Sequence, residues 1–200
     1  MLFEYFGRQY RDVFARFHIE LEPRETAGAD ENIKLLQDPN SDVEIAFVIG
    51  GVSDGKHAPG LLSLGTVWTQ PFWIFYSSNE PFDRLSQLKG KRIAVGPVGS
   101  GTRLNAEHIL GKGGVNSETA TLLPFAGTAA VEALNDGKVD AVWTISAPDA
   151  SAVQSLLKNP NVRLMSFPNA EAFTIIFPDL VRLIFPQAVI DVDRNIPPKM

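Results

Sequence analysis

Apolar residues at the start of the chain recur with the period of an α-helix. Phe3, Phe6, Tyr10, Val13 and Phe17 follow one another at spacings of three and four residues, with charged side chains between them. Such a stripe is typical of an amphipathic helix that turns its apolar side to a core. We therefore predict a helix over the first 17 residues.

The next 60 residues combine one short helix with several strand-like runs. Alternating residues predict a short strand at 18–22, and the pattern at 29–36 predicts a helix. The runs at 43–49, 61–64 and 67–77 are mostly apolar and rich in β-branched and aromatic residues. Such composition is typical of buried strands.

After Pro81 the pattern becomes a regular alternation of strands and helices. Strands are predicted at 92–96, 121–125, 140–144 and 163–167, and helices at 102–110, 128–134 and 149–157. This order is typical of right-handed βαβ units, whose strands pair in parallel. The predicted fold class is α/β, with parallel-rich sheets.

Composition excludes several classes of protein. The chain has 200 residues, of which 44% are hydrophobic, and no apolar run is as long as a membrane span. A net charge of −5 argues against a nucleic-acid partner. The absence of cysteine excludes thiol catalysis, cysteine-ligated zinc and disulfides. The first residues do not form a signal peptide, because an acid stands where basic charge is expected.

The most informative segment is a glycine-rich turn between a predicted strand and a predicted helix. Free N–H groups at a helix start, together with the helix dipole, attract anions. Gly99 and Gly101 let a ligand approach the backbone, and the hydroxyls of Ser100 and Thr102 are further donors. Ser100 fits a simple helix cap equally well. The turn is neither a phosphate loop, since Thr102 stands in place of its lysine, nor a G-x-S-x-G nucleophile turn.

Residues for catalysis are sparse. The histidines are His18, His57 and His108, and no two of them have the spacing of zinc ligands. Asp136 and Asp140 flank a glycine between a predicted helix and strand, where surface or capping roles are expected. We therefore predict a protein that is not an enzyme, with no catalytic residue, no metal site and no cofactor.

Four stretches in the same order resemble the solute receptors of the TAXI branch of TRAP transporters, which are type 2 periplasmic binding proteins. The longest is Leu88–Gly96 followed by Gly99–Thr102, and the others are 26–32, 133–141 and 194–198. The resemblance extends from about residue 3 to the end. Ala29 departs from it, since the family commonly has serine there, and so does Ile49-Gly50-Gly51, which replaces a more polar turn.

This resemblance implies two α/β lobes that close on a small solute. Residues 1–81 would form the first lobe, truncated at both chain ends, residues 82–190 the second lobe, and residues 191–200 a return to the first. The implied location is periplasmic or otherwise extracytoplasmic, with any membrane anchor outside these residues. The implied partners are an anionic solute and the permease subunits of a TRAP transporter, with no nucleic acid.

Ligands of open α/β sheets bind beyond the carboxyl ends of the strands. Together with the resemblance, this rule predicts that a small carboxylate-bearing solute, an amino acid or organic acid, binds at Thr26, Gly28, Asn32, Gly99, Ser100, Gly101, Thr102, Gly127, Thr128 and Trp143. Trp143 fits either the core or a pocket wall against an apolar part of the solute. Two alternatives are a ligand-sensing domain of the same fold and an α/β enzyme that binds an anionic substrate at residues 99–102.

Overall fold

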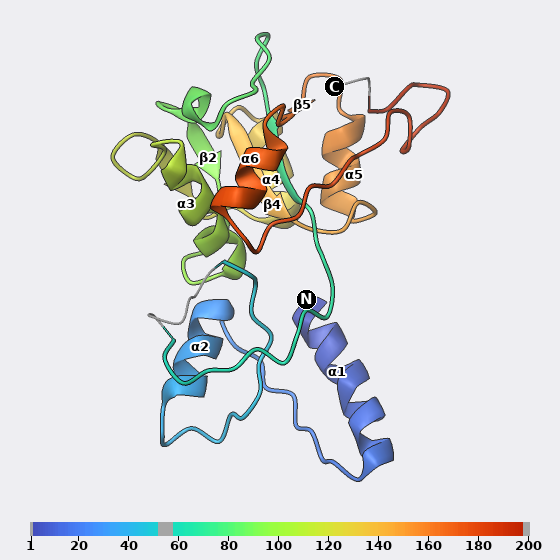
Figure 1. Ribbon diagram of the computed structural model, residues 1–200. Coiled ribbons are helices and arrows are strands. Elements are labelled where there is room, and N and C mark those ends of the chain that lie inside the picture. Colours follow the sequence, from blue (N-terminus) through green and yellow to red (C-terminus); the bar gives the residue numbers. More distant parts are fainter. Residues whose placement is uncertain (1, 52–57, 198–200) are drawn as a thin grey trace.

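The computed structural model of this chain describes residues 2–51 and 58–197. His57 lies outside the described residues. Figure 1 shows a mixed sheet with its helices in one part of the molecule, and the two N-terminal helices with their connecting segments in the other. The polypeptide passes from the N-terminal part into the sheet along residues 61–71.

The sheet has five strands in the order β3-β2-β4-β1-β5. Its strands are β1 (Phe72–Tyr76), β2 (Arg92–Ala94), β3 (Thr121–Leu123), β4 (Ala141–Ile145) and β5 (Arg163–Leu164). β2 pairs in parallel with β3 and β4, whereas β1 pairs antiparallel with β4 and β5. The α/β class is confirmed, but the sheet is mixed, because β1 precedes the βαβ units and antiparallel pairing needs no crossover helix.

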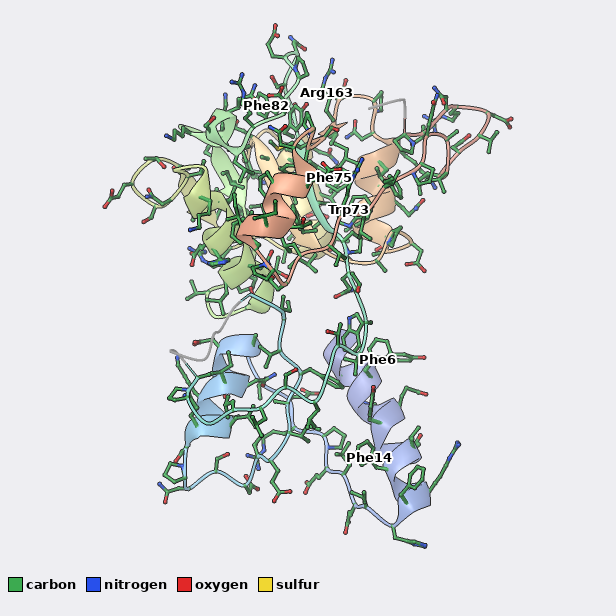
Figure 2. The ribbon with its side chains drawn as sticks, in the orientation of Figure 1. Phe6, Phe14, Trp73, Phe75, Phe82 and Arg163 are labelled. Carbon is green, nitrogen blue, oxygen red and sulfur yellow. The ribbon has the colours of Figure 1, made fainter. Side chains whose placement is uncertain are left out.

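Helices cover both faces of the sheet, and each face has its own core. α3 (Gly101–Lys112) and the end of α6 (Ala170–Ile176) enclose one apolar cluster, which includes Ile74. α4 (Gly127–Asn135) and α5 (Ser151–Lys158) enclose the other, which includes Phe75. Both side chains are fully buried, because neighbouring residues of a strand point to opposite faces. Figure 2 labels Trp73 and Phe75, which both belong to β1.

The predicted N-terminal helix is confirmed. α1 (Leu2–Phe14) continues into a 3-10 turn (Ala15–Phe17), and α2 (Ala29–Gln37) follows after an irregular segment. The apolar stripe is only partly covered. Phe6 stacks on Trp68 with ring centroids 4.2 Å apart, whereas Phe17 is 70% exposed. Aromatic contacts with the segments that follow hold this helix, rather than a closed core.

Several predicted strands are wrong. Residues 18–22, 43–49 and 61–64 form no strand, and only 72–76 of the run 67–77 does so. A strand requires a partner, and no ladder among the described residues pairs with these segments. Residues 43–49 are not buried either, since Ile45 is 49% exposed. The strand-like patterns of these segments therefore indicate that they are suited to a sheet, although they do not pair in this fold.

The sheet begins on the N-terminal side of the lobe boundary predicted at residue 81, because β1 lies between β4 and β5. The division of the chain into lobes stays a prediction. None of the helices within residues 2–51 and 58–197 has the length and hydropathy needed to cross a membrane.

An ion pair fixes the amino ends of β2 and β4. The Asp140 carboxylate accepts from Arg92 Nη2 at 2.7 Å, from Arg92 Nε at 3.1 Å and from the Arg92 backbone N–H at 2.8 Å. The side-chain hydrogen bonds from Arg92 hold the pKa of Asp140 below its ordinary value near 3.8, although partial burial opposes this shift. Asp140 is thus a structural residue, which agrees with the surface role expected for it.

Replacing Asp140 by asparagine is expected to reduce the free energy of unfolding by about 1 kcal/mol at pH 7, since both partners are partly exposed. A lowered pKa in the folded state stabilises the fold above about pH 4, and this contribution disappears as the pH falls through the folded-state pKa. Urea unfolding at pH 7 and pH 3 checks this. Asp136→Asn, which breaks only the exposed pair with Lys138, is the control with a smaller effect. If the wild type and Asp140→Asn differ in unfolding free energy as much at pH 3 as at pH 7, the Asp140 carboxylate does not stabilise the fold through its lowered pKa.

Candidate functional site

The start of α2 packs directly on the glycine-rich turn that precedes α3. Gly28 has φ 138°, and a Cβ atom there would lie 3.2 Å from both the Gly99 carbonyl oxygen and Ser100 Cα. Gly101 is buried beneath Ile49 and Ala29. The structure therefore brings two of the predicted segments together, but here the backbones of Gly28 and Gly99 to Gly101 contact each other.

Thr26 and Asn32 hold the loop before α2. The Thr26 hydroxyl donates to Asn32 Oδ1 at 2.6 Å, and Asn32 Nδ2 donates to the Phe47 carbonyl at 2.9 Å. The Glu31 carboxylate accepts from the Ala27 N–H at 2.6 Å. The hydroxyl hydrogen of Thr26 is thus already used, and Asn32 connects the helix to the following extended segment.

Ser100 caps α3. Its Oγ accepts from the Arg103 N–H at 3.3 Å and donates to the Pro97 carbonyl at 2.7 Å. The Arg103 side chain pairs with Glu107 on the next turn of the helix, with Nε and Oε1 2.8 Å apart. Of the two roles considered for Ser100, the structure shows the cap. The N–H groups of Gly101 and Thr102 donate to no acceptor among the described residues.

A small cavity of about 50 Å³ lies beyond the carboxyl ends of β2 and β4. The end of each strand and the first turns of α3, α4 and α5 contribute to its wall. Its lining consists of Gly96, Thr102, Ala126, Gly127, Ala130, Val142, Trp143, Thr144, Ala152 and Leu156. Thr102, Gly127 and Trp143 were predicted as ligand residues, whereas the predicted Thr128 is exposed and does not line the cavity.

The cavity offers hydrogen-bond donors without a charged side chain. α4 has no side-chain cap, and the N–H groups of Gly127, Thr128 and Ala129 have no partner among the described residues. Such N–H groups at a helix start attract a negative charge. Ligand pockets commonly measure about 300 to 1,000 Å³, so this volume accommodates one end group rather than a whole solute.

The structure places the Trp143 side chain in the core, and its role as a pocket wall stays a prediction. Its side chain is 2% exposed and stacks on Phe72 with ring centroids 4.8 Å apart, so it belongs to the core. The residue also lines the cavity. Its indole Nε1 is buried without a hydrogen-bond partner, and within the described residues only Asn105 Oδ1 shares this property.

Sequence reasoning missed most of the cavity wall. Thr144 stands at the end of a predicted strand, at the edge where ligands of α/β sheets bind, although it was not among the predicted ligand residues. The alanines at positions 126, 130 and 152 carry no chemical signal, since their contribution is only their small size. Within residues 2–51 and 58–197, His, Asp and Glu side chains form no group that could hold a metal ion.

The NMT1-like family model matches residues 14–197. The chain belongs to the NMT1-like family. Among solved structures, an ancestral arginine-binding protein bound to arginine is 21% identical, with a TM-score of 0.52 over 86% of this chain and 78% of that protein. This NMT1-like protein therefore has the α/β fold of two-lobed binding proteins.

Two sulphonate-binding proteins match a smaller part. The periplasmic aliphatic sulphonate-binding protein SsuA from Escherichia coli is 20% identical over 50% of this chain, with a TM-score of 0.39. SsuA from Xanthomonas axonopodis pv. citri, bound to MOPS, is 27% identical over 48%, with a TM-score of 0.40. The NMT1-like chain spans 31% of the length of each. The predicted fold is confirmed by the likeness to the arginine-binding protein, and the TAXI subtype stays a prediction.

Proposed function

We propose that this NMT1-like chain is the solute-binding part of an extracytoplasmic uptake system. It captures a small carboxylate-bearing solute, an amino acid or organic acid, and delivers it to the permease subunits of a TRAP-type transporter. The cavity between the starts of α3, α4 and α5 carries this proposal, since it has unpaired N–H donors and room for one end group.

A carboxylate suits this cavity for two reasons. The unpaired N–H groups of Gly127 and Thr128 and the dipole of α4 favour a negative charge, and no acidic side chain lines the wall to repel it. The threonine hydroxyls of the lining add donors that adapt to the carboxylate oxygens. Arginine, which the ancestral arginine-binding protein binds, also carries a carboxylate. The remainder of the solute then lies outside the cavity.

The contact between α2 and the turn before α3 supports capture by closure. Gly28 and Gly99 are 71 residues apart in the sequence, yet a Cβ atom on Gly28 would stand 3.2 Å from the Gly99 carbonyl oxygen. Close packing of this kind is expected when two lobes close. The resemblance to TAXI receptors supports the transporter partner and the extracytoplasmic location. Binding without turnover agrees with a cavity that holds no general base or nucleophile pair.

A panel of L-glutamate, L-arginine, succinate and ethanesulfonate tests the proposal by thermal unfolding and isothermal titration calorimetry. A solute at 100 times its Kd is expected to stabilise the protein by about 2.7 kcal/mol. Acids should raise the unfolding temperature, whereas their amides should not. Equal stabilisation by acid and amide would contradict a carboxylate site, and product formation in the mixture would contradict a purely binding role.

A further inference from the structure

A second hollow, of about 300 Å³, lies beside the carboxyl end of α1. Arg11 and Ala15 line it from the helix and its 3-10 turn, and residues 19–23 line it from the segment that follows. The aliphatic residues of this segment, of which Ile19 is 49% exposed, make part of the wall apolar. Figure 1 shows this end of α1 directed away from the sheet. This α1 hollow is therefore separate from the solute cavity.

An exposed aromatic side chain stands next to the α1 hollow. Phe17 lies in the chain between Ala15 and Ile19, which both line the hollow. The turn is tight, because the His18 N–H donates to the Ala15 carbonyl at 3.2 Å and the Ile19 N–H donates to the Phe14 carbonyl at 3.2 Å. Phe17 is 70% exposed and contacts no aromatic ring among the described residues. Exposed aromatic side chains of this kind are enriched where proteins bind one another.

The same surface carries unpaired charges of both signs. The side chains of Arg16, Glu20 and Glu22 are exposed, and none of them forms a hydrogen bond or ion pair with residues 2–51 or 58–197. On α1 itself, by contrast, the Arg8 guanidinium pairs with the Glu4 carboxylate at 2.9 Å. Glu20 and Glu22 line the α1 hollow, and Arg16 neighbours Phe17. A cation and two carboxylates thus stand beside one apolar hollow without a partner.

A surface with these features is complementary to a copy of itself. In a two-fold contact, a residue of one copy meets a second residue of the other copy, and the reverse contact also forms. An aromatic side chain next to a hollow, and a cation next to carboxylates, satisfy this requirement together. A purely basic or purely acidic partner protein would match only one of the two charge signs.

We propose that two copies of this chain associate through the surface formed by residues 15–23 and Arg11. Phe17 of each copy enters the α1 hollow of the other, and Arg16 of each copy pairs with Glu20 and Glu22 of the other. The contact includes none of the residues that line the solute cavity. The inference therefore does not depend on the proposed function, and either can fail without the other.

Sedimentation equilibrium of the whole chain, from about 1 µM to about 1 mM, tests the association over the range expected for a contact of small area. The wild type is expected to form dimers that dissociate as the salt concentration rises. Phe17→Ser should weaken the dimer at least about 10-fold, because an aromatic side chain is removed from the centre of the contact. Its unfolding temperature should not change, since Phe17 is 70% exposed.

Ile175→Ser is the matched control, since Ile175 is an apolar residue of α6 that is 81% exposed and lies outside this surface. It should leave the dimer affinity within about 2-fold of the wild type. Equal affinities of Phe17→Ser and the wild type would overturn the inference. So would a wild type that stays monomeric at every concentration, whatever else binds in the α1 hollow.

Charge reversal tests the pairing of the two copies. Arg16→Glu alone, and Glu20→Arg/Glu22→Arg alone, should each weaken the dimer at least about 10-fold, because like charges then face each other. An equimolar mixture of these two variants should form a heterodimer, since both sets of charges are again opposite. A structural defect in either variant would not be repaired by mixing. If the mixture is no more dimeric than its separate components, these charges do not pair across the contact and the inference is wrong.

Discussion

Replacing Gly28 by valine is expected to destabilise the protein by about 3 kcal/mol and to separate α2 from the turn before α3. Gly28 has φ 138° and ψ −161°, a backbone conformation that is essentially restricted to glycine. A Cβ atom would also stand 3.2 Å from Gly99 O and from Ser100 Cα, and both are backbone atoms that cannot rotate away. The substitution therefore adds backbone strain and a contact that only a shift of the whole segment relieves.

Urea unfolding of Gly28→Val and Gly65→Val separates these two contributions. Gly65 has a similar φ of 131°, but nothing lies within 4 Å of its Cβ position. Gly65→Val should therefore show the backbone effect alone, and Gly28→Val should be less stable by at least about 1 kcal/mol more. Equal destabilisation by the two variants would show that the contact between Gly28 and the turn does not contribute.

The helices of the sheet part could be predicted from sequence because their boundaries have local causes. The glycine-rich turn and Ser100 fix the start of α3, and the structure starts that helix at Gly101, one residue before the predicted Thr102. Gly137, with φ 66°, follows the end of α4, where the pattern predicted a stop. Such signals act over a few residues, so a single sequence contains them.

Strand pairing could not be predicted, because it depends on residues far apart in the chain. The run Phe72–Tyr76 clearly predicts a strand, but nothing local states that it lies antiparallel between β4 and β5. Residues 43–49 have an equally apolar pattern and form no ladder. Instead, the Phe47 ring contacts Trp68, with centroids 5.3 Å apart. A strand-like pattern indicates that a segment is suited to a sheet, and tertiary contacts decide whether the segment becomes a strand.

The candidate site was predicted where its chemistry is visible and missed where only size matters. Thr102 and Gly127 stand at helix starts, so the rule for α/β sheets finds them. Gly99 and Gly101 carry the same signal, yet they contact the start of α2. That contact is between two segments distant in sequence, and the wall of the cavity is likewise built from distant segments. The empty space depends on small side chains such as Ala130, for which sequence offers no distinguishing mark.

Filling the cavity is expected to abolish solute binding. Ala130 is 2% exposed and lines the cavity from α4, so Ala130→Leu places additional methyl groups into a volume of about 50 Å³. A solute end group and a leucine side chain cannot share this space, and affinity for the acid that binds the wild type should fall at least about 100-fold. The cost to stability should be modest, about 1–3 kcal/mol, because an existing void receives part of the side chain.

Ala129→Leu is the matched control for this experiment, since it adds the same atoms one residue earlier on the same helix. Ala129 is exposed and does not line the cavity, so calorimetric affinity should stay within about 2-fold of the wild type. The comparison separates occupation of the cavity from any general effect of leucine on α4. If Ala130→Leu folds and binds as tightly as Ala129→Leu, the solute does not enter this cavity. Loss of affinity in Ala130→Leu alone would place the solute between the first turns of α3, α4 and α5, where the unpaired N–H groups lie.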